Sequence, residues 1–305
     1  MDKKILESLN NAFKKARITG ELCDASIIKY KDSIKKFFSV INKDVDNLSV
    51  DDFGEFIENM KDKESSNSRI ANVISAVKWF IGKLQKDGSA KQIKLEEIIK
   101  PKIIRKEVNY LTEEEVKIFL NSVESDINDG MAIRKIRAMT LFLFLLRTGC
   151  RIGEALSINY EDIDRMNKEV QIIGKGSKPR TLFLTDDVLQ WIDKYLAMRK
   201  DLNKPLFVSL NGRSRWKQTD VGRTFRRYKK LSGIKKKFTI HTLRHTFATQ
   251  YLMRGAGINV VQAALGHSDA VTTLKYYAGP ASKVRVKEMI NDKYFDFISA
   301  NYLDN

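Results

Sequence analysis

Apolar residues recur at helical spacing along most of the chain, and one short segment alternates as a β-strand does. Between residues 27 and 41, and again between residues 70 and 84, Ile, Val, Leu and Phe follow the three- and four-residue steps that line one face of a helix. β-Forming residues fill Glu169–Ile173 and Arg180–Leu184, and Gly174–Ser177 supplies the turn between them. The pattern predicts a mainly α protein with a small β-hairpin or sheet.

A change in composition divides the chain at about residue 108. The segment Lys91–Asn109 is basic and contains Pro101, and Thr112 and Glu115 then have the spacing of a helical capping box. A chain of 305 residues also suits two domains. We expect a helical bundle over residues 1–100, a linker over 101–109, a mixed and mostly helical domain over 110–281, and a helical tail over 282–305.

Basic residues outnumber acidic ones, and the excess is concentrated in one stretch. The chain carries 55 Lys and Arg against 38 Asp and Glu, a net charge of +17. Between Arg199 and Lys237 there are 14 basic residues and two acidic ones, Asp201 and Asp220. Because uncompensated like charge attracts polyanions, we expect a phosphate-contacting surface here, with nucleic acid favoured over a membrane and over an ordinary solvated face. The candidates for contact with nucleic acid are Arg213, Arg215, Lys217, Arg223, Arg226 and Arg227.

The remaining composition favours a cytoplasmic protein. The two cysteines, Cys23 and Cys150, exclude a disulfide scaffold and indicate a reducing compartment. The longest largely apolar run, Ala138–Leu146, has nine residues and is too short to span a bilayer. The first residues are polar and lack the apolar segment of a signal peptide. We therefore expect neither secretion nor a membrane partner.

The residues able to do chemistry gather in four blocks of the second domain. Thr148–Glu154 contains an arginine between two glycines, and Gly174–Gly176 places a lysine at the tip of the hairpin. All three histidines fall between residues 241 and 267, in His241–His245 and in Leu265–Ser268, and Tyr276 follows nine residues later. Two arginines, two histidines, a lysine and a tyrosine form a set that suits tyrosine attack on a phosphodiester.

In this order, over about 125 residues, the four blocks resemble the tyrosine recombinases, the phage-integrase and Xer-like family. The resemblance implies a helical domain that clamps duplex DNA opposite a catalytic domain, and a protein that cuts and rejoins DNA through a 3′-phosphotyrosine intermediate. It implies integration and excision, or resolution of chromosome dimers, by a tetramer on two DNA sites. It implies no cofactor and no metal, and it leaves accessory proteins open. The protein would act at the nucleoid, or in a host cell if a mobile element encodes it.

The resemblance makes Tyr276 the nucleophile and gives Arg151 and Arg244 the non-bridging oxygens of the scissile phosphate. Negative charge grows on that phosphate in the transition state, and a guanidinium donates two hydrogen bonds to phosphate without ever losing its charge. Tyr277 is the alternative nucleophile, and the spacing from His267 selects Tyr276. Tyrosine has a reference pKa of about 10, so nearby cations must favour its phenolate.

The other candidates assist the transfer of protons or support the site. The resemblance implies that His241 and His267 act at the phosphate oxygens and in proton transfer, and that Lys175 protonates the departing 5′-oxygen. It implies that Glu154 supports the site from behind. His245 is interpreted as a histidine packed behind the site.

Other interpretations remain open at this stage. His241 and His245 have the spacing of two zinc ligands on a helix, but Thr242 stands where a zinc hydrolase would carry its glutamate. A DNA-binding protein without chemistry would explain the basic stretch but not the six-residue set. Relaxation of supercoils by a type IB topoisomerase would share the mechanism. The tail beyond Ala281 would dock on its own domain or, as the resemblance implies, on a neighbouring protomer.

Overall fold

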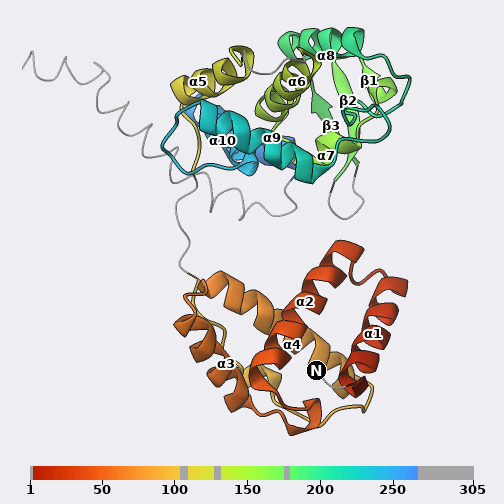
Figure 1. Cartoon of the computed structure of the whole chain (residues 1–305), viewed down its shortest axis with the longest axis vertical. Coiled ribbons are helices and arrows are strands. Elements are labelled where there is room, and N and C mark those ends of the chain that lie inside the picture. The colour runs from red at the N-terminus through yellow and green to blue at the C-terminus, as the bar shows by residue number, and fades with distance from the viewer. Residues whose placement is uncertain (1–2, 104–108, 127–131, 175–178, 267–305) are drawn as a thin grey trace, which may run out of the picture. The chain divides into compact units, whose positions relative to one another are not determined.

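The computed structural model describes residues 3–103, 109–126, 132–174 and 179–266. The chain divides into two compact units, Met1–Arg105 and Lys106–Asn305 (Figure 1). In the described residues no helix is both long and apolar enough to cross a membrane. As expected, the described residues are mostly helical and include one small sheet.

The first unit is the predicted helical bundle. Its helices are α1 (Lys3–Ile18), α2 (Asp24–Ile41), α3 (Val50–Asp62) and α4 (Asn67–Lys86), with 3₁₀ turns η1 (Val45–Asn47) and η2 (Leu95–Glu97). Helix α4 packs against the other three, because its apolar stripe is fully buried. Phenylalanine rings fill the centre, where Phe37 lies 4.9 Å from Phe53 and 5.0 Å from Phe56 between ring centroids. All the buried residues of this core belong to the first unit.

The segment after α4 packs back onto the first unit. Ile98 is buried in its core. Nζ of Lys78 donates to the carbonyl of Ile98 at 3.3 Å, and Nδ2 of Asn67 donates to the carbonyl of Lys102 at 2.8 Å. The chain is therefore held to the first unit as far as residue 102.

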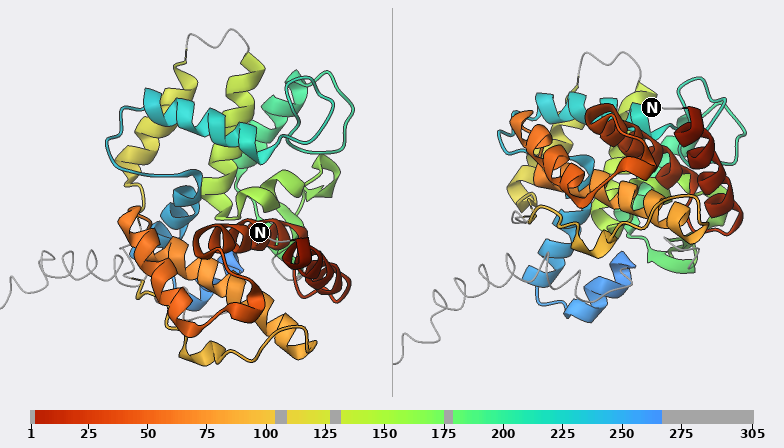
Figure 2. Two further views of the ribbon diagram at one scale, coloured as in Figure 1. Left: turned by 60° about the horizontal axis from the view of Figure 1, so that its bottom comes forward. Right: turned by 90° about the horizontal axis from the view of Figure 1, so that it is seen from below.

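Seven helices and a three-stranded sheet form the described part of the second unit. The helices are α5 (Glu113–Glu124), α6 (Ala132–Thr148), α7 (Ile152–Ser157), α8 (Asp186–Met198), α9 (Gln218–Leu231), α10 (Ile240–Met253) and α11 (Ile258–Leu265). The 3₁₀ turn η3 (Tyr160–Asp162) precedes the sheet. Helix α6 runs through the middle of the unit and contacts α5, α8 and α10 (Figure 1 and Figure 2). The run from Ala138 to Leu146 is buried throughout, which makes α6 the central core helix.

The sheet contains the predicted hairpin and one further strand. Strands β1 (Ile163–Asp164), β2 (Glu169–Ile173) and β3 (Pro179–Phe183) are antiparallel in the order β1-β2-β3. Val170 faces Leu182 and Gln171 faces Thr181, so apolar and polar pairs alternate between the two faces. Strand β1 has two residues, too few to show any alternation, and the sequence did not predict it. The turn residues 175–178 lie outside the described residues.

Helix α10 is more buried than its many polar residues indicate. Eight of its residues are buried, and three of these are threonines. Threonine can lie in the interior because its hydroxyl group can find a hydrogen-bond partner there. Oγ1 of Thr246 donates to the carbonyl of Thr242 at 2.9 Å and accepts the backbone N–H of Leu111 at 2.9 Å. Residues that look polar in the sequence therefore face the core.

Replacing Gly149 tests the turn between α6 and α7. Gly149 has a φ of +61°, and a Cβ there would lie 2.4 Å from Cδ1 of Phe247. Left-handed backbone and overpacking each cost a side chain about 1–2 kcal/mol or more, so Gly149→Ala should lower the free energy of unfolding by about 3 kcal/mol. Gly153→Ala is the control, because its Cβ meets nothing within 4 Å. Denaturant unfolding should separate the two variants, and equal stabilities would refute this role for Gly149.

Candidate active site

The first turn of α7 fixes Arg151 through the carboxylate of Glu154. Arg151 is the N-cap of the helix and Glu154 is its third residue. Oε2 of Glu154 accepts the backbone N–H of Arg151 at 2.7 Å, and Oε1 accepts Nη1 of the same arginine at 2.9 Å. One carboxylate therefore orients both the backbone and the side chain of Arg151. The sequence predicted a supporting role for Glu154, and these two hydrogen bonds are the contacts through which it would act.

A second arginine, Arg180 of β3, shares the same carboxylate. Its Nη2 donates to Oε2 of Glu154 at 2.7 Å, and its Nη1 donates to the carbonyl of Ala264 near the end of α11. Burial alone would raise the pKa of Glu154, but the hydrogen bond from the Arg151 backbone and the charge of Arg180 hold that pKa below its ordinary value. Glu154 is therefore ionised at neutral pH, between two guanidinium groups.

Sequence reasoning missed Arg180, although a signal was present. Side chains two residues apart share one face of a strand, so Arg180 lies on the face of Leu182 and Leu184, both of which are buried. A basic residue on the apolar face of a strand indicates a buried ion pair.

Arg151 and His241 line one pocket of about 570 Å³. Glu154, Ser157 and Gln218 add polar groups to its wall. The described residues that line it are Arg151, Ile152, Gly153, Glu154, Ser157, Ile173, Gly174, Gln218 and His241. Two of the predicted catalytic residues thus meet from α7 and α10. Gln218, the first residue of α9, was not predicted, and the sequence offers no signal for it.

Arg244 lies in the interior beside this pocket. The residue is 2% exposed. Its Nη1 donates to the carbonyl of Gly149 at 2.7 Å, and its Nη2 donates to the carbonyl of Leu265 at 2.8 Å. Arg244 is not among the described residues that line the pocket, and it ties α10 to the turn before α7 and to the end of α11.

The two histidines of α10 lie against each other. The rings of His241 and His245 are 4.7 Å apart between centroids and nearly perpendicular. Desolvation, followed by the positive charges of Arg244 and Arg151, lowers the pKa of His241 below its ordinary value. His241 is therefore neutral at pH 7. His245 instead lines a separate pocket of about 510 Å³ with Lys229 and other residues.

The alternative of a zinc site depends on a cluster of metal-ligating side chains. In the part of the chain that the structure describes, no three His, Cys, Asp or Glu side chains are grouped so that they could hold a metal ion. Cys150 is buried, and this burial raises the pKa of its thiol to about 11. The thiol of Cys150 is thus protonated at neutral pH and is a poor ligand or nucleophile.

Three predicted catalytic residues, Lys175, His267 and Tyr276, lie outside the described residues, as does Tyr277. The structure does place neighbours of two of them. Gly174 lines the pocket, and Gly266 ends α11 with a left-handed φ of +62°. Gly266 is thus the left-handed C-cap glycine of α11.

The six basic candidates for DNA contact fall into two groups. Three of them have partners: Arg215 donates to the carbonyls of Leu156 and Ile158, and Arg223 and Arg227 pair with acidic residues. Among the described residues, the other three have exposed side chains without a hydrogen-bond or ion-pair partner. These are Arg213, Lys217 and Arg226.

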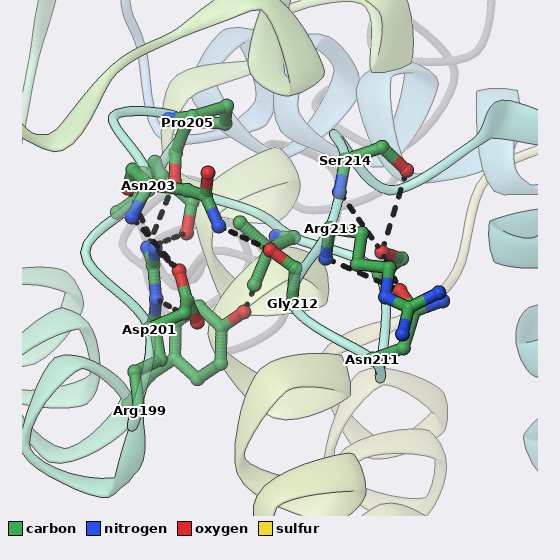
Figure 3. A network of polar contacts seen from close by, with 12 residues as sticks. Arg199, Asp201, Asn203, Pro205, Asn211, Gly212, Arg213 and Ser214 are labelled. Carbon is green, nitrogen blue, oxygen red and sulfur yellow. Dashed lines mark hydrogen bonds and ion pairs between the residues drawn. The ribbon is translucent and has the colours of Figure 1, made fainter.

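Arg199, which begins the basic stretch, serves the loop that follows it. Its guanidinium pairs with Asp201 and donates to the carbonyls of Asn203 and Pro205, at 2.7 Å and 2.8 Å (Figure 3). The side chain of Arg199 is 3% exposed. The high charge of the stretch therefore overstates the number of cations free to meet a polyanion.

Comparisons with known proteins all lead to one family. Residues 109–283 match the model of the phage integrase family. A tyrosine recombinase of Thermosipho africanus is 30% identical over 253 residues, 81% of this chain and 86% of the relative. Tyrosine recombinase XerD of Oceanobacillus iheyensis is 31% identical over 295 residues, 92% of this chain and 96% of the relative.

Solved structures share the fold. The crystal structure of XerA recombinase is 27% identical with a TM-score of 0.52, and the alignment covers 93% of this chain and 98% of that one. XerH site-specific recombinase, in a post-cleavage complex with a palindromic difH substrate, has a TM-score of 0.72 at 23% identity. That alignment covers 89% of this chain and 80% of that one, and it supports the fold alone.

The pKa of His241 tests the electrostatics of the pocket. Replacing Arg151 by Gln removes a positive charge, so the pKa of His241 should rise toward 6.5 in an NMR titration of the imidazole ring. Arg213→Gln is the control, because Arg213 does not line the pocket.

The same shift has a consequence for stability. The folded pKa of His241 lies below the unfolded value, so the unfolded state binds the proton more readily and the free energy of unfolding falls as the pH drops below about 6.5.

In the titration of Arg151→Gln, an unchanged pKa of His241 would show that the charge of Arg151 does not reach His241.

Proposed function

Because the chain belongs to the phage integrase family and is a tyrosine recombinase, we propose that it breaks and rejoins duplex DNA through a 3′-phosphotyrosine intermediate at the pocket of Arg151 and His241. The observation that carries this proposal is the fixed guanidinium of Arg151 on the wall of a pocket that His241 also lines. A cation held in place before the reaction stabilises a developing phosphorane charge without any cost of reorganisation.

In the proposed reaction, the phenolate oxygen of Tyr276 attacks the scissile phosphorus. A bond forms between phosphorus and the tyrosine oxygen, and the bond from phosphorus to the 5′-oxygen breaks. Lys175 gives its proton to the departing 5′-oxygen, and Arg151 donates to the non-bridging oxygens. Arg244, whose two Nη groups donate to the carbonyls of Gly149 and Leu265, is proposed to stabilise the same oxygens through its positive charge. The phosphodiester energy is kept in the covalent link, so a 5′-hydroxyl of another strand can reverse the step without ATP.

His241 fits the role of a proton acceptor. A neutral imidazole can take the phenol proton of Tyr276, and the lowered pKa keeps His241 neutral at pH 7. His267, which follows the end of α11, is proposed to assist at the same phosphate. In this proposal His245 stays behind the site.

The wider assembly follows from the same proposal. Residues 1–100 would contact DNA as the second half of a clamp, residues 101–109 would link it to the catalytic domain 110–281, and the tail 282–305 would dock on a neighbouring protomer. Four protomers on two DNA sites would exchange strands, for integration and excision or for resolution of chromosome dimers. Several related structures are complexes with DNA, such as that of a λ integrase dimer bound to a core site. We place this activity in the cytoplasm.

Covalent trapping tests the nucleophile. We expect the wild-type protein, incubated with fragmented source DNA in EDTA, to form adducts that survive denaturation, and Tyr276→Phe to bind DNA but form none. Tyr277→Phe is the matched control and should still form adducts. Adducts that persist in Tyr276→Phe and vanish in Tyr277→Phe would move the nucleophile to the neighbouring tyrosine. Cleavage that appears only when metal is added would replace the proposal with hydrolysis.

The salt dependence of DNA binding tests the phosphate contacts. Lys217→Gln and Arg226→Gln should each reduce the slope of log K against log salt by about 1, since each removes one phosphate contact. Lys194→Gln is the control and should leave the slope unchanged. The ammonium of Lys194 lies over the ring of Trp191 on α8, and α8 is at the far side of the unit from α10 (Figure 1). Equal slopes for all three variants would place the DNA surface elsewhere.

A further inference from the structure

We propose that Arg180 is a positioning residue of the strand-cleavage reaction. Arg180 holds Arg151 in its active orientation, and it also fixes the end of α11. This inference rests on the proposed function, and Arg180 acts through its neighbours. The side chain of Arg180 is 12% exposed, whereas that of Arg151 is 34% exposed. Of the two arginines on Glu154, Arg151 is therefore the one that reaches the pocket.

The sharing of Glu154 decides how much charge Arg151 presents. Oε2 of Glu154 accepts both Arg180 and the backbone N–H of Arg151, which leaves Oε1 for Nη1 of the Arg151 side chain. Two guanidinium groups around one carboxylate leave a net positive charge. Without Arg180, Oε2 would lose one of its two donors and could approach the Arg151 guanidinium as Oε1 already does, and a bidentate pair would offset more of its charge. Arg180 thus keeps part of the Arg151 fork available to a phosphate.

Arg180 also meets the end of α11. Its Nη1 donates to the carbonyl of Ala264. A Cβ on Gly266 would lie 2.7 Å from Cδ of Arg180 and 2.9 Å from its Nε. Only glycine allows this approach, so the last turn of α11 rests directly on the Arg180 side chain. The next residue along the chain is the candidate His267.

One side chain therefore joins three segments that lead to candidate catalytic residues. Strand β3 begins at Pro179, four residues after Lys175, and α7 begins beside Arg151. Arg244 makes a similar connection, since it joins Gly149 to Leu265 by two hydrogen bonds. Arg180 joins the carbonyl of Ala264 to Glu154, and Arg244 joins the next carbonyl of α11, that of Leu265, to Gly149.

The test compares two substrates and uses the full-length protein. Each duplex carries the site recovered by covalent trapping, with either a normal phosphate or an uncharged methylphosphonate at the scissile position. Arg180→Gln should slow cleavage of the phosphate substrate by roughly 100-fold, because a misplaced and neutralised Arg151 no longer offsets the negative charge of the scissile phosphate. The loss on methylphosphonate should be under about 10-fold, since that group carries less charge to offset. DNA affinity should change by less than about 3-fold, since one phosphate contact is a small share of the total.

Arg199→Gln is the matched control, because Arg199 is also a buried arginine paired with a carboxylate of the same unit. It should leave the ratio of the two cleavage rates as in the wild type. Arg180→Lys guards against a folding failure of Arg180→Gln, because a lysine keeps the charge but makes fewer directed bonds. It should show the same selective loss at an intermediate size.

The outcomes separate the two proposals. If the wild-type protein forms no covalent product, the proposed function fails. If the wild type cleaves but the Arg180 variants lose activity equally on both substrates, Arg180 has a structural role only and this inference is overturned. Full activity of Arg180→Gln on the phosphate substrate would overturn it as well.

Discussion

The buried carboxylate of Glu154 is the interaction on which the catalytic unit depends. An ionised group in the interior is costly unless charges and hydrogen bonds compensate it. Arg151 and Arg180 supply that compensation from α7 and β3. Arg180 extends the network, because its Nη1 also donates to the carbonyl of Ala264 in α11. Segments more than a hundred residues apart in the chain are thereby fixed around one charge.

Periodicity predicted most of the fold, since the long helices and the β2–β3 hairpin bury one regular face. It failed where burial does not follow polarity. Thr246 and Thr249 of α10 are fully buried, so a helix that looks half polar belongs to the core. Strand β1 is too short to carry a pattern. The composition of the basic stretch likewise could not show that the guanidinium groups of Arg199 and Arg215 donate hydrogen bonds to backbone carbonyls.

The candidate site was predictable in its residue types but only partly in its geometry. Motif order pointed to Arg151 and His241, and the structure brings them to one pocket. Arg244 is present as well, but both its terminal amino groups already serve backbone carbonyls, which spacing alone cannot reveal. The place of Arg180 on the apolar face of β3 indicated a buried ion pair, but no local pattern could identify its partner, Glu154, which lies 26 residues away in the chain. Such long-range pairs are set by tertiary packing.

Chemistry at a tyrosine, supported by cations and needing no metal, is the central claim for this recombinase. Tandem mass spectrometry of the peptide that carries DNA after covalent trapping examines it most directly. We predict a nucleotide joined by its 3′-phosphate to Tyr276. A nucleotide on any other residue, or a DNA end with no attached peptide in every cleaved product, would contradict it.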